Sequence, residues 1–306
     1  MVPALDEVGN KLVPFFETLL PTTIFLTLFV TFSKVNFHQM RLRRWHFYIL
    51  AVQLFIVAIL TLLIQNSEFI FQNCQLSNPG VSSVPLGQAA NYPFLKLLLE
   101  AVLICVIAPC ASASPVVTAK LGGDLTQMTT FVLLSSIITS VLIPAIFPLL
   151  EPHQGLSFGV AFWMILKRLT SVLLLPLALG SIVRHCIKPL YNWFMRMQDL
   201  GFYIWSLSLA VVVGLTLRNI VHSAANIHLL IAIAVFTLFT AILQFVIGRM
   251  VGRVTGDKIS TGQGMFQKNT GLAIWIAYVY LTPEASIGAG CYVLWQNIIN
   301  SIELRR

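Results

Sequence analysis

Long apolar stretches, separated by short polar segments, follow one another along almost the whole chain. Each is close to the roughly 20 residues that an α-helix needs to cross a bilayer, and none shows the ~10-residue alternation of a membrane β-barrel. The pattern predicts nine transmembrane helices, at residues 13–33, 47–65, 94–118, 126–149, 169–185, 199–217, 228–250, 259–281 and 286–303. Residues 157–166 are rich in aromatic side chains and end at Lys167 and Arg168, so we expect them to lie at the membrane interface.

Two of the predicted spans are interrupted by helix-breaking or polar residues. Pro109 and Pro115 flank small and hydroxyl side chains in the third span, and each proline removes a backbone donor. In the eighth span two glycines precede the run Gln267–Thr270, which carries the charge of Lys268. A charge at bilayer depth costs at least about 2.5–3.5 kcal/mol, and irregular backbone persists there only inside protein or beside a watery cavity. Two such breaks five spans apart are typical of a secondary-transporter binding site; an ordinary proline kink and a snorkelling Lys268 are the alternatives.

The composition identifies an integral membrane protein. Hydrophobic residues make up 57% of the chain and charged residues only 10%, whereas soluble domains carry about 25% charged residues. The net charge is +8, but most of the 19 Lys and Arg residues lie in the connecting segments on one side of the predicted spans. This asymmetry predicts a multi-pass protein of the cell (inner) membrane, with its N-terminus outside and its C-terminus in the cytoplasm. The basic excess is thus a topology signal, and we expect a lipid bilayer, not nucleic acid, as the partner.

Several function classes find no support in the residues. The five cysteines have neither a disulfide-framework spacing nor a metal-ligand spacing, so no metal and no cofactor is expected. No nucleophile–base set is visible in the spans, which makes an intramembrane enzyme the weakest reading. Residues 1–12 carry Asp6 and Glu7 without a basic stretch and are not expected to be a secretory signal.

Three elements of the chain resemble those of the bile acid:sodium symporter family. They are Pro109 with Ala113-Ser-Pro-Val116, then Asn269-Thr-Gly-Leu-Ala273, and Leu294-Trp-Gln-Asn297, within a likeness that runs from about residue 20 to the end. In bacterial members ten helices form two inverted five-helix repeats, divided between a panel and a core. Two broken helices cross in the core, bind two sodium ions and face organic anions such as bile acids or smaller carboxylates.

The resemblance implies a fold and a domain division for this chain. We expect an all-α integral membrane protein with nine transmembrane helices, in which inverted five-helix repeats lacking the first helix form panel and core domains with two crossed, broken helices. Residues 1–306 then form a single transmembrane transporter domain, with its first repeat at 13–149 and its second at 157–304.

The chain departs from the family pattern at its ion site. Pro115 stands at the family's asparagine, Gly264 at its sodium-binding glutamate and Lys268 at its glutamine, while Asn269 is retained. Sodium needs oxygen ligands, and an ammonium within ~4 Å of a bound cation repels it by several kcal/mol at an effective dielectric near 20. We therefore expect sodium-independent transport, or transport in which Lys268 carries a proton. A shifted alignment, in which glutamine oxygens bind the ion, is the alternative.

The predicted function is secondary active transport of an organic anion, bile-acid-like or a small carboxylate, by alternating access, with sodium or a proton as possible coupling ion. Alternatives are an arsenite or auxin-like substrate on the same fold, or a non-transporting membrane sensor. The oligomeric state is not predicted. The expected substrate and ion contacts are Ser112, Ser114, Thr118, Gln263, Gln267, Lys268, Asn269, Thr270, Gln296 and Asn297.

Overall fold

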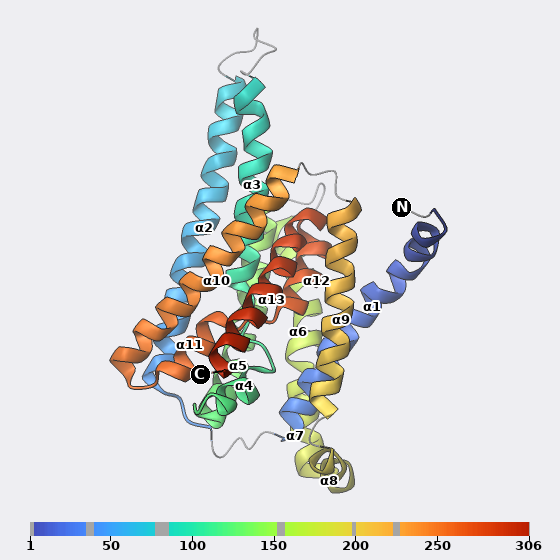
Figure 1. The fold of residues 1–306 in the computed structure, drawn as a ribbon, viewed down its shortest axis with the longest axis vertical. Coiled ribbons are helices and arrows are strands. Elements are labelled where there is room, and N and C mark those ends of the chain that lie inside the picture. The colour runs from blue at the N-terminus through green and yellow to red at the C-terminus, as the bar shows by residue number, and fades with distance from the viewer. Residues whose placement is uncertain are drawn as a thin grey trace.

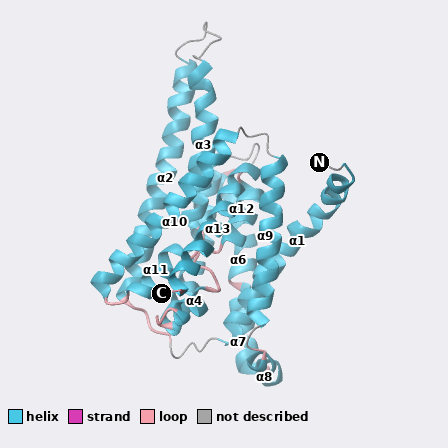
Figure 2. Cartoon of the chain, viewed as in Figure 1, coloured by secondary structure: helices cyan, strands magenta, loops and turns pink. Residues whose placement is uncertain are grey.

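The computed structural model describes residues 3–34, 40–76, 86–151, 157–197, 200–222 and 227–305, and the regular structure of these residues is helical (Figures 1 and 2). The helices, in chain order, are α1 (Pro3–Lys34), α2 (Arg44–Leu76), α3 (Leu86–Ile107), α4 (Ser114–Lys120), α5 (Leu125–Leu150), α6 (Phe158–Leu173), α7 (Leu175–Cys186), α8 (Lys188–Arg196), α9 (Leu200–His222), α10 (Ile227–Thr255), α11 (Lys258–Phe266), α12 (Thr270–Tyr280) and α13 (Pro283–Leu304). The all-α prediction is confirmed for these residues.

Short polar side chains mark where several helices begin. Asp124, Asp257, Asn269 and Thr282 cap α5, α11, α12 and α13, each accepting a hydrogen bond from the backbone amide three residues on. Such caps satisfy amides that have no partner inside their own helix. The cap of α12 is notable because Asn269 lies within a predicted membrane span, where water cannot replace it.

The helices pack in two groups. We refer to α1, α6, α7, α8 and α9 as the panel helices, because α1 packs on α7 and α9, and α7 on α6 and α8. We refer to α2–α5 and α10–α13 as the core helices, in which α10 packs on α11 and α13, and α13 on α3 and α12. Figure 1 shows α2 and α10 on one side, α1 and α9 on the other, and α12 and α13 between them. Contacts of α5 with α6, of α12 and α13 with α9, and of α12 with α1 join the two groups.

Five helical segments of the described residues are long and apolar enough to cross a membrane. They are Pro14–Lys34, Arg44–Ser67, Leu125–Leu150, Phe158–Cys186 and Ile227–Thr255, and Tyr203–Arg218 and Thr270–Tyr280 are shorter apolar helices. These segments confirm a multi-pass membrane protein. The count of nine spans, the repeats at 13–149 and 157–304, and the orientation of the termini stay predictions.

The segment 157–166, expected at the membrane interface, is helical, and its depth in the membrane stays a prediction. It forms the first part of α6, which continues past Leu174 into α7, so that Phe158–Cys186 is one apolar stretch. Within this stretch Lys167 and Arg168 are exposed, and the guanidinium of Arg168 lies over the ring of Trp275 on α12.

Three further boundaries differ from expectation. Helix α1 begins at Pro3 rather than near residue 13, α2 continues beyond residue 65 to Leu76, and α3 begins at Leu86 rather than near residue 94. Helices α2 and α3 pack against each other, and their ends project beyond the other helices in Figure 1. The Asn78–Pro85 stretch lies outside the described residues.

Helices α10 and α11 approach so closely that only glycine fits between them. A Cβ at Gly248 would lie 2.6 Å from the carbonyl oxygen of Thr261, and one at Gly252 would lie 2.4 Å from the Cα of Lys258. This contact holds the first half of the interrupted pair, α11, directly on the long helix α10.

Candidate functional site

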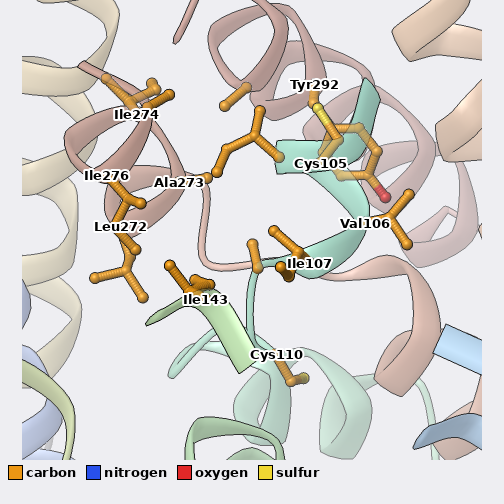
Figure 3. Packing of buried hydrophobic residues seen from close by; sticks show 14 of the residues in the cluster. Cys105, Val106, Ile107, Cys110, Ile143, Leu272, Ala273, Ile274, Ile276 and Tyr292 are labelled. Atoms are coloured by element: carbon orange, nitrogen blue, oxygen red, sulfur yellow. The ribbon is translucent and has the colours of Figure 1, made fainter. Parts of the chain in front are cut away.

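The two interruptions predicted from the sequence meet in space. The segment that follows α3 and the segment between α11 and α12 pair in antiparallel fashion: the amide of Asn269 donates to the carbonyl of Pro109 (2.8 Å), and the amide of Ala111 to that of Gln267 (2.9 Å). In Figure 3 the end of α3, with Val106 and Ile107, and the start of α12, with Leu272, lie around this crossing. Pairing satisfies backbone groups that neither broken helix can satisfy internally, as a membrane interior requires.

Lys268 lies at the centre of the crossing and is almost fully buried, with 1% of its surface exposed. Its Nζ donates to the carbonyl oxygen of Val106 (3.1 Å), and its backbone amide donates to Oε1 of Gln296 (2.8 Å). Val106 lies in the last turn of α3, where carbonyl groups lack partners within the helix and the helix dipole is negative. The ammonium of Lys268 therefore compensates the carbonyl end of a half-helix.

Uncharged side chains also donate hydrogen bonds to the carbonyl groups at the end of α3. Nε2 of Gln53 lies 3.0 Å from the carbonyl oxygen of Val106, 3.5 Å from that of Ile107 and 3.4 Å from that of Ala108. Oγ1 of Thr139 donates to the carbonyl of Ile107 (3.3 Å). Among the ion pairs of the described residues none involves Lys268, so its charge faces carbonyl dipoles rather than a carboxylate.

The position at which the resemblance implies a sodium-binding glutamate is closed by aromatic side chains. A Cβ added at Gly264 would lie 3.2 Å from ring carbons of Phe131 and Trp45, closer than an ordinary van der Waals contact. Phe131 and Trp45 pack against each other with ring centroids 5.2 Å apart. A carboxylate side chain at this position has no space without displacing these rings.

The first interruption contributes hydroxyl and thiol groups next to the crossing. Oγ of Ser114 donates to the carbonyl of Gln267 at the long limit of a hydrogen bond (3.5 Å), and the thiol of Cys110 lies 3.2 Å from the same Oγ. The amide of Cys110 donates to Oγ of Ser135 (3.1 Å). Ser112, which is half-buried, lies in the loop between α3 and α4.

The structure brings some of the expected site residues together and leaves others apart. Those at the crossing are Ser114, Gln267, Lys268, Asn269, Thr270 and Gln296. Gln263 instead donates to Oδ1 of Asn300 (3.0 Å), within a cluster that also holds the Arg249–Glu303 ion pair. Thr118 lies one helical turn beyond Ser114, against Gly123, and Asn297 lines an open groove on α13 with Leu294 and Ile298.

The sequence reasoning missed three buried polar side chains of the core helices. Besides Gln53, they are Gln244 and Tyr292: the Tyr292 hydroxyl donates to the carbonyl of Phe266 (2.7 Å), the last residue of α11, and accepts from Nε2 of Gln244 (3.0 Å). Gln53 and Gln244 were visible as single glutamines inside apolar spans, a pattern that indicates a polar partner in the protein. No signal in the sequence pointed to the carbonyl groups that they contact.

Replacing Tyr292 with phenylalanine is expected to lower the free energy of unfolding by about 1–3 kcal/mol, because the buried carbonyl of Phe266 loses its hydroxyl donor and the amide of Gln244 keeps only a long contact with the carbonyl of Cys105 (3.5 Å). The melting temperature of the purified protein in detergent measures this loss. Tyr48→Phe is the matched control, since Tyr48 is 49% exposed, and it should melt like the wild type. Equal melting of the two variants would contradict the role assigned to Tyr292.

A second cation lies where the panel and the core meet. The guanidinium of Arg168, on α6, lies 5.0 Å from the ring centroid of Trp275 on α12 and contacts the hydroxyl of Tyr280. Arg168 is ten residues into α6, about 15 Å from its start at 1.5 Å per residue. A cation stacked on an indole is stabilised electrostatically, and more so away from water. Arg168 is thus a charged side chain at the panel–core boundary within an apolar stretch.

Comparison with known proteins shows the family to which the chain belongs. Residues 21–223, more than half of the chain, match the model of a family described as the Sodium Bile acid symporter family. The match covers the first interruption and ends before α10, so it does not include the second interruption. No curated protein matches the chain. The apolar spans and this match show that the chain is a multi-pass membrane protein and belongs to the sodium bile acid symporter family of transporters.

Proposed function

We propose that the protein is a secondary active transporter of an organic anion that works by alternating access between the panel and core helices, and that it does not use sodium at the crossing of its broken helices. The observation that carries the proposal is the position of Lys268, whose Nζ lies 3.1 Å from the carbonyl oxygen of Val106 at the end of α3. In this proposal the ammonium is a tethered cation that takes the place of a dissociable one.

Electrostatics supports the exclusion of sodium. An ion bound to the Val106 carbonyl would lie within about 5 Å of Nζ, and two unit charges at this distance repel by about 3 kcal/mol at an effective dielectric of 20. That is a loss of roughly 100-fold in affinity or more. Gly264 has no side chain, and the space beside it is filled by Phe131 and Trp45, so no carboxylate at this position offsets the repulsion. Pro115 likewise lacks the amide side chain that an asparagine would offer.

Lys268 does not serve as the contact for an anionic substrate in this proposal. Only 1% of its surface is exposed, and its ammonium already has an acceptor. Arg168 is the better candidate, because it is exposed at the panel–core boundary and no acidic side chain of the described residues pairs with it. An ionisable side chain inside a membrane segment marks a substrate or ion path by default. A guanidinium can also bind a carboxylate through two parallel hydrogen bonds.

Uptake into proteoliposomes tests the proposed function. Tritiated taurocholate and radiolabelled succinate represent a bile acid and a small carboxylate. We expect saturable uptake of at least one of them, changed less than about twofold when choline replaces sodium, since the tethered ammonium makes a bound ion unnecessary. A parallel series with and without a proton gradient separates facilitated transport from transport in which Lys268 releases a proton. Uptake that requires sodium would contradict the coupling proposal, and no saturable flux of either anion would contradict the substrate class.

Replacing Arg168 with glutamine is expected to lower the uptake of the transported anion by about 10–100-fold, which corresponds to the roughly 1.5–3 kcal/mol of a hydrogen bond to a charged group. Lys167→Gln is the matched control: it removes one charge from the neighbouring, exposed position of α6. We expect Arg168→Lys to recover only part of the uptake, because lysine lacks the planar, bidentate donor set. A loss of the same size in Lys167→Gln would assign the effect to surface charge instead of Arg168.

A further inference from the structure

Helix α8 (Lys188–Arg196) is a short helix between α7 and α9 that the proposed function does not use. It begins two residues after Cys186, the end of the apolar stretch Phe158–Cys186. Figure 1 shows it at the tip of the panel helices, beyond the end of α7. A helix that follows directly on a membrane span lies at the level of the lipid headgroups.

One face of α8 is fixed to the panel. Phe194 is 5% exposed and packs with Val30 of α1 and Val183 of α7. The ring of Phe29 meets that of Phe194 edge-on, with centroids 5.6 Å apart. Nζ of Lys34, the last residue of α1, donates to the carbonyl of Met197 just after α8 (3.0 Å). The helix is therefore an anchored part of the fold, with a defined outward face.

The outward face of α8 is amphipathic. Lys188, Asn192 and Arg196 are exposed and recur every four residues, so they form one polar stripe opposite Phe194. Trp193, next to this stripe, and Met197, directly after α8, are 48% and 42% exposed. A surface with both a basic stripe and exposed tryptophan and methionine fits neither bulk water nor the bilayer centre, but it fits the boundary between them.

Basic residues outnumber acidic ones in the sequence around α8. Arg184 lies at the end of α7 and Lys34 at the end of α1, so four cationic side chains gather here with Lys188 and Arg196. Nη1 of Arg184 donates to the carbonyl of Lys34 (3.3 Å), which places these two residues together. The sequence from Arg184 to Arg196 contains no acidic residue, and the next one along the chain, Asp199, lies outside the described residues. Clusters of four or more Lys and Arg beside a membrane span are complementary to anionic lipid headgroups.

We propose that α8 is an interfacial helix that binds anionic phospholipids, with Lys188 and Arg196 on the headgroups and Trp193 and Met197 in the upper acyl region. By the positive-inside asymmetry the lipids belong to the cytoplasmic leaflet. This anchor joins the ends of α1 and α7 to the membrane surface through the packing of Phe194, and so fixes the panel against the bilayer while the core moves. The inference does not rest on the identity of the substrate or of the coupling ion.

Lipid binding is measured on the full-length protein in nanodiscs that contain phosphatidylcholine with increasing phosphatidylglycerol. Native mass spectrometry of protein released from the discs counts retained phosphatidylglycerol molecules. Each Lys or Arg near an anionic surface contributes roughly fivefold to binding, so the double variant Lys188→Gln/Arg196→Gln should bind phosphatidylglycerol about 25-fold more weakly than the wild type. The matched control, Lys120→Gln/Lys258→Gln, removes two exposed charges from the core helices and should change binding by less than about twofold. Equal losses in the two double variants, or no preference of the wild type for phosphatidylglycerol over phosphatidylcholine, would overturn the proposal.

Tryptophan fluorescence locates the apolar part of the face independently. Phosphatidylglycerol brominated near the headgroup end of its acyl chains quenches indoles at that depth. We expect the quenched fraction of the signal to fall in Trp193→Phe, because one interfacial indole is lost, and to keep its wild-type value in Lys120→Gln/Lys258→Gln. Unchanged quenching in Trp193→Phe would place α8 in water and overturn the proposal, whether or not the protein transports either anion.

Discussion

Sodium is expected to leave the melting temperature of the wild-type protein unchanged and to raise that of a Lys268→Gln variant. In the wild type the ammonium of Lys268 compensates the carbonyl groups at the end of α3, and Nζ lies 3.1 Å from the oxygen of Val106. Glutamine removes the charge and adds an amide oxygen, so the carbonyls keep only uncharged donors such as Gln53. The negative end of α3 then favours a mobile cation in the place of the ammonium.

The size of the effect follows from ligand linkage. Sodium at about 100 times its dissociation constant would stabilise the variant by about 2.7 kcal/mol, a rise of roughly 5–10 °C for a chain of this size. Melting is compared in sodium chloride and in choline chloride at equal ionic strength. Lys120→Gln, which makes the same chemical change at an exposed position of α4, is the control and should not respond. A wild-type protein that sodium stabilises as strongly as it does the variant would show that Lys268 leaves the cation site open.

Replacing Gly252 with alanine is expected to cost at least about 3 kcal/mol of stability, at the upper end of the range for overpacking a protein interior. The added Cβ would lie 2.2 Å from Oγ1 of Thr261, 2.4 Å from the Cα of Lys258 and 2.7 Å from the carbonyl oxygen of Asp257. Two of these atoms are backbone, so a rotamer change cannot relieve the clash and α11 has to move away from α10. Because α11 carries one half of the crossing, its displacement also disturbs Lys268.

Gly214→Ala is the control for this prediction. Gly214 is also inside a helix, α9, but no other atom lies within 4 Å of its added Cβ. Its replacement should be neutral or should stabilise the protein by up to about 1 kcal/mol, through the higher helix propensity of alanine. Size-exclusion chromatography after heating gives the melting temperature of each variant. Similar melting of Gly252→Ala and Gly214→Ala would mean that α10 and α11 are not in the close contact described here.

Several features followed from the order of residues alone. Apolar runs of membrane length predicted a multi-pass helical protein, and the Leu125–Leu150 and Ile227–Thr255 stretches agree with that expectation. The prolines at 109 and 115 predicted an interruption between α3 and α4, and the polar run at Gln267–Thr270 predicted that between α11 and α12. These predictions succeed because lipid imposes the same local demand at each position: apolar side chains, and backbone groups that are satisfied within the helix.

Other features depended on contacts between residues far apart in the chain. The local pattern around Arg168 resembles a membrane boundary, and nothing in it indicates that the guanidinium lies over the ring of Trp275 on the distant helix α12. Gln263 and Gln267 look equivalent in the sequence, but Gln263 donates a hydrogen bond to Asn300 on α13 and lies away from the crossing.

The sequence by itself determined that this protein is helical, crosses the membrane, and has two interrupted helices, one of which carries a charge. Only the tertiary structure decided what that charge does: it brought the end of α3, 162 residues away, to the ammonium of Lys268. The same folding closed the space at Gly264 with Trp45 and Phe131. The physical reason is that a buried charge takes its role from the dipoles and the free volume around it, and both are supplied by distant segments that local sequence does not specify.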